Sequence, residues 1–378
     1  MASRLPSLVT KLHQGMSKPK PITRLPPLPS TKELLRLYNV RATKALSQNF
    51  LLDPKLTNKF VSKAGNIRDA YVCEVGPGPG NITRSILNHC PQHVIVIEKD
   101  TRFMPALSLL QDASKGRMSV VFGDVLNFEM GMLFPKECKK SWDDECPPIH
   151  LVGNLPFSIS LPLIIKWLKA ISERSSVWKY GRAKMTLTFQ EEVAIRMTVP
   201  AGHEERCRLS LMCQNWCEVE HKFTIPGSAF YPKPRVNVGV VTLTPRISPL
   251  VPLNFPIVEK VLRHLFNTKN KMCKNPLKKL FPLSKREELT AKLMTVADVD
   301  PTITPVNLTM EELHRLTMAY DCILEQYPSL RSYDNRDKKN NEATGLFDEI
   351  PPPISLQKSQ YLLEEAKRQI NNESLDNL

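Results

Sequence analysis

The ten residues from Tyr71 to Gly80, which read YVCEVGPGPG, constrain the fold of this chain more than any other stretch. An apolar run ends at Glu74 and Val75 and gives way to three glycines at every second position, and Asn81–Leu87 then follows a helical pattern. A buried strand that enters a tight glycine turn and then a helix is typical of a doubly wound α/β sheet, in which the missing Cβ atoms let the backbone approach a ligand. The lysine and hydroxyl residue of a P-loop do not follow, so a phosphate-cradling loop is disfavoured.

Strands and helices alternate after this turn. The expected further strands are Val94–Glu98, Met118–Asp124, Ile149–Gly153 and Met185–Phe189, with a final hairpin near Phe223 and Val236–Thr244. The expected helices are Thr101–Asp112, Leu161–Leu168 and Glu191–Met197, and the charged, proline-rich stretch Pro135–Pro148 is interpreted as a surface insertion. This alternation predicts a mostly parallel sheet with its ligand crevice at the carboxyl ends of the strands.

Acidic residues end three successive strands of this predicted sheet, namely Glu74, Glu98 and Asp124. Any one of them could be a helix cap, but three in succession after a glycine turn indicate ligand contacts. Glu98 follows the glycines by about 20 residues, where an acid accepts hydrogen bonds from ribose hydroxyls. Glu74 could face a positively charged ligand or order the loop amides, whereas it would repel a diphosphate.

The fourth strand leads into Asn154-Leu155-Pro156-Phe157, whose chemistry is the most specific in the chain. The Asn154 amide oxygen and the Leu155 carbonyl can accept both protons of an exocyclic amine, and Pro156 fixes the backbone so that these two acceptors converge. Phe157 offers a flat face on which a base can stack, worth ~1–3 kcal/mol. Such a pocket suits an adenine taken out of its stack. The simpler alternative is a turn with a buried phenylalanine.

Composition restricts the partners. The net charge of +14 and a sequence pI near 9.3 favour anionic partners, nucleic acid first. No apolar run reaches the ~18 residues of a membrane span, so no membrane partner is expected. Nine cysteines without a C-x-x-C pair favour neither a disulfide framework nor a metal site. The grouping Cys207, Cys213 and Cys217 is interpreted as small buried residues.

The N-terminal residues 1–30 form a basic arm. No acid occurs before Glu33, while six lysines and arginines do, with frequent serine and threonine. This composition fits a mitochondrial transit peptide and hence a matrix location, the alternative being a basic arm that touches nucleic acid. A catalytic domain is expected over residues 31–244 and a helical domain over 245–332. Residues 333–378 are polar and are expected to be disordered.

The helical domain carries a cluster of positive charge. The cluster consists of Lys269, Lys271, Lys274, Lys278 and Lys279. A run of charge is usually a solvated face, but five lysines without an acid among them can neutralise several phosphates. The sequence therefore predicts that this run contacts phosphates, and the family resemblance described below implies that they belong to rRNA.

Taken together, these motifs resemble the KsgA-type rRNA adenine N6-dimethyltransferases. The resemblance covers roughly residues 40–330 and includes LSQNFL at 46–51, EVGPGPG, NLPF and the segment SAFYPKPRV at 228–236. It implies a Rossmann-like class I methyltransferase sheet with a smaller C-terminal all-α domain, and S-adenosylmethionine as cofactor. The implied reaction transfers two methyl groups to N6 of each of two adjacent adenines near the 3′ end of small-subunit rRNA.

The resemblance also implies roles for individual residues. Asn154, Leu155 and Pro156 would hold the target amine, and Phe157 and Phe230 would sandwich the base. The residues implied to bind the cofactor are Asn49, Leu51, Gly76, Gly78, Glu98, Lys99, Asp124, Val125 and Asn154. Two departures bear on rate and base preference: Phe157 stands where bacterial members usually carry tyrosine, and Asn237 where a serine is expected.

With the transit-like arm, the resemblance implies a mitochondrial member that acts on the 12S rRNA of the assembling small ribosomal subunit. The chain is expected to be a monomer, and a second role with the mitochondrial transcription machinery is left open. The main alternative is a nucleic-acid-binding factor for transcription or assembly that keeps the fold without turnover. A relative that methylates adenine in DNA shares the chemistry, but the basic helical domain fits rRNA better.

Overall fold

The computed structural model describes residues 25–40, 42 and 48–336 of the 378-residue chain. The N-terminal residues 1–24 and the tail from 337 onward therefore lie outside the described residues, as do the transit-arm and tail predictions that concern them. The described chain divides into two compact units. One holds the described residues up to Thr198 together with Trp216–Ile247, and the other holds Val199–Asn215 and the described residues from Ser248.

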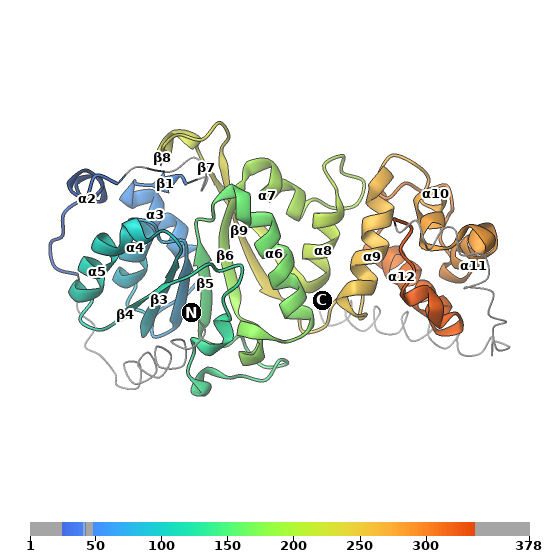
Figure 1. Cartoon of the computed structure of the whole chain (residues 1–378), viewed down its shortest axis with the longest axis horizontal. Coiled ribbons are helices and arrows are strands. Elements are labelled where there is room, and N and C mark those ends of the chain that lie inside the picture. The colour runs from blue at the N-terminus through green and yellow to red at the C-terminus, as the bar shows by residue number, and fades with distance from the viewer. Residues whose placement is uncertain (1–24, 41, 43–47, 337–378) are drawn as a thin grey trace, which may run out of the picture. The chain divides into compact units, whose positions relative to one another are not determined.

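The first unit is built on a seven-stranded sheet with the strand order β4-β3-β2-β5-β6-β9-β7 (Figure 1). The strands are β2 Tyr71–Val75, β3 His93–Glu98, β4 Met118–Phe122, β5 Ile149–Gly153, β6 Lys184–Gln190, β7 Cys217–Ile225 and β9 Val238–Pro245. The first five are parallel to one another, and β9 and β7 join antiparallel. Because β3 and β5 are buried along their whole length, they read in the sequence as continuous apolar runs. The predicted α/β class with a mostly parallel sheet is confirmed.

Helices flank this sheet. They are α2 Thr31–Leu37, α3 Pro54–Ser62, α4 Asn81–Asn88, α5 Met104–Ala113, α6 Phe157–Ser172 and α7 Glu191–Thr198. Helices α4 and α5 lie beside β3 and β4, and α6 and α7 lie beside β6 and β9 (Figure 1). A two-stranded sheet pairs β1 Phe50–Leu51 antiparallel with β8 Phe230–Tyr231, which brings Leu51 opposite Phe230. Two of the motifs that carry the family resemblance, 180 residues apart, therefore meet.

The stretch Pro135–Pro148 was predicted to be a surface insertion; most of its residues are exposed, and it is held against the rest of the first unit. The indole of Trp142 is 9% exposed and donates to the carbonyls of Arg246 and Ile247, at 3.1 and 2.8 Å. Arg182 donates to the carbonyls of Trp142 and Asp144, at 2.9 and 2.8 Å. Side chains from outside the stretch thus hold its backbone in place.

The second unit is helical throughout the part that the structure describes. Its helices are α8 Arg208–Trp216 (whose last residue belongs to the first unit), α9 Phe255–Leu265, α10 Lys274–Leu277, α11 Arg286–Ala297 and α12 Met310–Gln326. The sequence-based boundaries placed residues 199–215 in the catalytic domain, but their contacts group them here. Arg206, 1% exposed, donates to the carbonyls of Val306, at 3.0 Å, and Leu308. An arginine buried against backbone 100 residues away cannot be recognised from local sequence.

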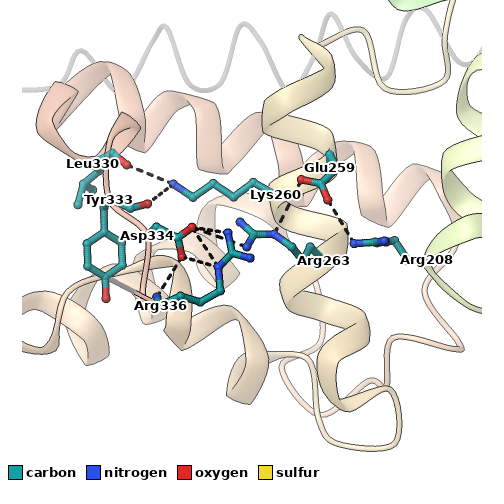
Figure 2. A network of polar contacts seen from close by, with 8 residues as sticks. All are labelled: Arg208, Glu259, Lys260, Arg263, Leu330, Tyr333, Asp334 and Arg336. Carbon is teal, nitrogen blue, oxygen red and sulfur yellow. Dashed lines mark hydrogen bonds and ion pairs between the residues drawn. The ribbon is translucent and has the colours of Figure 1, made fainter. Parts of the chain in front are cut away.

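A chain of ion pairs ties segments of this unit to α9 (Figure 2). Glu259 pairs with Arg208 at 3.2 Å and with Arg263 at 3.8 Å, and Asp334 pairs with Arg263 at 3.8 Å. The ammonium of Lys260 donates to the carbonyls of Leu330 and Tyr333, at 3.3 and 2.8 Å. Burial lowers the pKa of Lys260 to about 8. Leu330, Tyr333 and Asp334, which follow α12, are thereby fixed to α9. Among the described residues, no helix has both the length and the apolar character to cross a membrane.

Candidate active site

A cavity opens at the carboxyl ends of β2, β3 and β5. Its lining combines segments that are far apart in the sequence: residues 48–51, the glycine turn and the start of α4, the end of β3, the Asn154 motif, and β8. The lining residues are Gln48, Asn49, Phe50, Leu51, Gly76, Pro77, Gly78, Pro79, Asn81, Ile82, Glu98, Asn154, Leu155, Pro156, Phe157 and Phe230. The sequence motifs that were predicted to form one site therefore share one cavity.

Three of the residues assigned to the cofactor do not line this cavity: Lys99, Asp124 and Val125. The Lys99 ammonium pairs with Asp124 Oδ2 at 2.8 Å, and Asp124 Oδ1 accepts from the Leu126 amide at 3.0 Å. The hydrogen bond from Lys99 lowers the pKa of Asp124, and the Leu126 amide adds to this effect. The structure thus places Asp124 in an ion pair at the end of β4, beside the cavity wall formed by β3.

The glycine turn is shaped to leave room above β2. Gly76 and Gly78 have φ angles of 68° and 54°, in the left-handed region that side chains disfavour. A Cβ atom on Gly78 would lie 3.0 Å from the ring of Phe50, which itself packs edge-on against Phe103 at a centroid distance of 5.4 Å. Only glycine at position 78 allows the turn and the Phe50 wall to approach this closely.

The Glu98 carboxylate orders this turn. Its Oε2 accepts from the Gly78 amide at 2.9 Å and its Oε1 from the Asp100 amide at 2.8 Å, while only 6% of the residue is exposed. Burial raises the pKa of Glu98, and the backbone hydrogen bonds oppose that rise. A carboxylate has about four acceptor positions, so Glu98 keeps capacity for hydroxyl donors in the cavity.

Glu74 has a different role from the one expected for it. It is 1% exposed, accepts from the Thr83 hydroxyl at 2.6 Å and is not among the cavity-lining residues. Burial raises its pKa to about 8, although the bond from Thr83 opposes that rise. The loop amide of Gly78 is held by Glu98 and not by Glu74. Glu74 is therefore a buried acid behind the turn, linked to α4.

Two neighbours fix the side-chain amide of Asn154. Its Oδ1 accepts from the hydroxyl of Thr188 on β6 at 2.9 Å, and its Nδ2 donates to the carbonyl of Asn49 at 2.8 Å. Thr188 is fully buried, so Asn154 has a defined orientation in the cavity. The sequence analysis missed Thr188, because a threonine in an apolar strand carries no local sign of a polar partner.

Hydrogen bonds of Asn237 and Glu191 hold the segment that carries Phe230 in place. Asn237 Oδ1 accepts from the Gly227 amide at 3.1 Å, and Asn237 Nδ2 donates to Glu191 Oε2 at 3.0 Å. Thr224 donates to the other oxygen of Glu191 at 3.1 Å. Asn237, which stands where the family resemblance leads us to expect a serine, therefore fits this position, because its amide supplies both a donor and an acceptor that hold the loop.

The five lysines of the helical unit do not form one uniform face. Lys269, Lys271 and Lys279 are exposed, and Lys274 and Lys278 are half-buried. Lys278 pairs with Glu287 at 2.7 Å, and the Lys269 ammonium donates to the carbonyl of Glu204 at 2.9 Å. Although no acid lies within the run itself, the fold brings one to Lys278.

The sheet order, the glycine turn and the cavity at the strand ends define a Rossmann-like methyltransferase. A family model described as ribosomal RNA adenine dimethylase matches residues 39–317. Over 315 residues the chain is 52% identical to dimethyladenosine transferase 1, mitochondrial, of Xenopus tropicalis, covering 83% of this chain and 91% of the relative. It is 50% identical over 315 residues to the Homo sapiens protein of the same name, with the same coverage. The chain belongs to the ribosomal RNA adenine dimethylase family, and the resemblance drawn from its motifs is confirmed.

A solved structure agrees with this fold. The crystal structure of a dimethyladenosine transferase from Plasmodium falciparum superposes with a TM-score of 0.57 at 23% identity, covering 71% of this chain and 96% of that one. At this identity the likeness concerns the fold alone.

Proposed function

We propose that this chain uses S-adenosylmethionine to dimethylate N6 of two adjacent adenines in the 3′-terminal hairpin of mitochondrial small-subunit (12S) rRNA. One observation carries the proposal: the glycine turn, Glu98, the Asn154–Phe157 motif and Phe230 line a single cavity. Family membership supports the reaction, and the mitochondrial names of the relatives support the location, which we take to be the matrix.

The residues of the cavity fit this cofactor. Gly78 carries no side chain, and a Cβ there would press against the Phe50 ring of the cavity wall. Glu98 offers a buried hydrogen-bond acceptor at the end of β3. Asn49, Leu51, Gly76, Gly78 and Glu98 would hold the bound molecule. When bound, S-adenosylmethionine supplies an electrophilic methyl group on a sulfonium. The acceptor positions of Glu98 that the Gly78 and Asp100 amides leave free would take the ribose hydroxyls of the bound molecule.

The adenine would be positioned by the Asn154 motif. Asn154 Oδ1 and the Leu155 carbonyl accept the two protons of the amine, and Thr188 and Asn49 keep the Asn154 amide from rotating. Pro156, with φ of −56°, restricts the backbone directly after the Leu155 carbonyl and so helps the two acceptors to converge. Phe157 and Phe230 supply stacking faces worth ~1–3 kcal/mol each. No strong base is required, because the amine proton becomes acidic once the nitrogen is alkylated.

The roles of Asp124 and Val125 toward the adenine of the cofactor, and of Lys99 beside Glu98 at its ribose, stay predictions. Asp124 could accept from an amine with the lone pairs that Lys99 and Leu126 leave free. The exposed lysines Lys269, Lys271 and Lys279 would contact rRNA phosphates. The assembling small subunit is the proposed setting, and an association with the transcription machinery stays open.

The cavity favours an enzyme over a non-catalytic nucleic-acid-binding factor, because a pure binder has no use for a base pocket beside a cofactor site. Methyl transfer to a small-subunit 3′ hairpin tests this directly, with wild type compared to Glu98→Ala and Asn154→Ala. We expect Asn154→Ala to bind cofactor and RNA but lose transfer, and Glu98→Ala to lose cofactor binding. A wild-type protein that binds both and transfers nothing would refute the enzyme and support the alternative.

A further inference from the structure

Asn81, the first residue of α4, joins three separate segments at the edge of the cavity. It lines the cavity, its Nδ2 donates to the carbonyl of Leu51 at 2.5 Å, and its Oδ1 accepts from the hydroxyl of Thr31 at 2.9 Å. Leu51 belongs to β1, which lines the cavity and whose Phe50 approaches the glycine turn closely. One side chain thus connects the turn, the β1 wall and the N-terminal helix α2.

The segment that reaches Asn81 from the N-terminal side is firmly docked on the first unit. Ser30 and Glu33 form a reciprocal capping box at the start of α2, and Leu34 is 1% exposed. Arg84, one turn beyond Asn81, donates to the carbonyl of Pro29 at 2.8 Å. We name residues 25–37 the N-terminal strap. Its residues 25–30 were assigned to the transit-like arm from the sequence, yet Pro29 contacts α4.

The β1 wall needs such support. Strand β1 has two residues and pairs only with the two residues of β8, and so short a ladder holds a backbone weakly. The bond from Asn81 to the Leu51 carbonyl ties β1 to α4, which packs on the main sheet. The Leu51 carbonyl can only accept, so it selects the Nδ2 end of the Asn81 amide, and the Thr31 hydroxyl then donates to the remaining oxygen and holds the amide in this orientation.

We propose that Asn81 is a positioning residue through which the N-terminal strap fixes the β1 wall of the cofactor cavity. The inference rests on the proposed function in taking this cavity as the S-adenosylmethionine site. The strap is then part of the cofactor-binding apparatus, and Thr31 acts on the cavity without touching it.

The test measures binding of S-adenosylmethionine and S-adenosylhomocysteine to the full chain by calorimetry, without RNA. The variants are Asn81→Ala, Thr31→Val, Thr31→Ser and the double variant Thr31→Val/Asn81→Ala, and the matched control is Asn88→Ala at the exposed other end of α4. We expect Asn81→Ala to raise Kd about tenfold and Thr31→Val about threefold, the range that a lost hydrogen bond produces. Thr31→Ser should bind like wild type because it keeps the hydroxyl.

The coupling between the two residues is decisive. The double variant should bind like Asn81→Ala alone, since the Thr31 bond acts only through Asn81. Asn81→Ala should raise KM for the cofactor and leave kcat at saturating cofactor within about twofold. Unchanged Kd in folded Asn81→Ala, or additive effects in the double variant, would overturn the inference. If Asn81→Ala does not fold, a wild-type cofactor Kd in Thr31→Val would overturn the inference instead. A wild type that binds neither ligand would instead refute the proposed cofactor, and so the proposed function itself.

Discussion

The hydroxyl of Thr188 donates to Asn154 Oδ1 at 2.9 Å across the β5–β6 pair. Thr188 is fully buried, so water cannot take over this hydrogen bond when the partner is lost. The same Asn154 amide donates to the carbonyl of Asn49, which precedes β1 and also lines the cavity. The orientation of the acceptor proposed for the target amine therefore depends on a residue that does not itself line the cavity.

Thr188→Val keeps the shape of the side chain and removes the donor. We expect kcat to fall about tenfold, while Kd for the cofactor stays unchanged, because the Asn154 amide loses one of its two orienting bonds. Single-turnover methylation and calorimetry measure the two quantities separately. Thr186→Val, on the same buried face of β6, is the control and should keep wild-type kcat. Equal losses in both variants would point to repacking of the strand rather than to orientation of Asn154.

Alanine substitutions at Gly78 and Gly65 separate the cost of positive φ from the effect on the cofactor cavity. Gly78→Ala and Gly65→Ala both place a side chain at positive φ, which costs about 1 kcal/mol of stability. Only at Gly78 would the new Cβ also approach the Phe50 ring, at 3.0 Å, whereas nothing lies within 4 Å at Gly65. Both variants should melt at lower temperature, but only Gly78→Ala should weaken cofactor binding, about tenfold or more, because it displaces the cavity wall. Comparable cofactor Kd values for the two variants would contradict this role of the turn.

The sheet and the cavity were largely predictable from the sequence, for a physical reason. Strands buried on both faces read as continuous apolar runs, and parallel strands bring their carboxyl ends to one edge. Glu98 and Asn154, which follow such runs, therefore meet at the cavity as expected. The register that brings Leu51 opposite Phe230 was not predicted, because the two short segments are far apart in the sequence and carry no pattern that pairs them.

Interactions between distant polar groups could not be predicted. The sequence shows five lysines without an acid, but the fold brings Glu287 to Lys278. It shows an acid at the end of β4, but not that Lys99 holds Asp124 in an ion pair. Residues 199–215 lie between α7 and β7 of the first unit in the sequence, yet Arg206 donates to backbone carbonyls just before α12. Each case is a side chain that selects its partner in three dimensions, where neither periodicity nor propensity reports it.

The buried Glu74 carboxyl should make the free energy of unfolding depend on pH. Its pKa is about 8 in the folded state and 4.5 in the unfolded chain, so between these values the folded state binds more protons. Stability should therefore fall as pH rises through this window, by up to about 1.4 kcal/mol per pH unit. Glu74→Gln cannot ionise and can still accept from Thr83. Thermal unfolding from pH 5 to 9 should show a flatter profile for Glu74→Gln than for wild type and the greatest gain at the alkaline end. Exposed Glu145→Gln is the control and should follow the wild-type profile.

Salt dependence tests whether the lysine run of the helical unit contacts RNA. The triple variant of Lys269, Lys271 and Lys279 to alanine removes the three exposed charges. If each contacts a phosphate, the slope of log K against log salt should become shallower by about 2, since each contact contributes ~0.7–0.9. Lys278→Ala is the matched control: because Glu287 already neutralises that ammonium, the slope should change little. Binding of a small-subunit 3′ hairpin by fluorescence anisotropy at several salt concentrations gives both slopes. An unchanged slope in the triple variant would mean that the run is only a solvated face and that the RNA binds elsewhere.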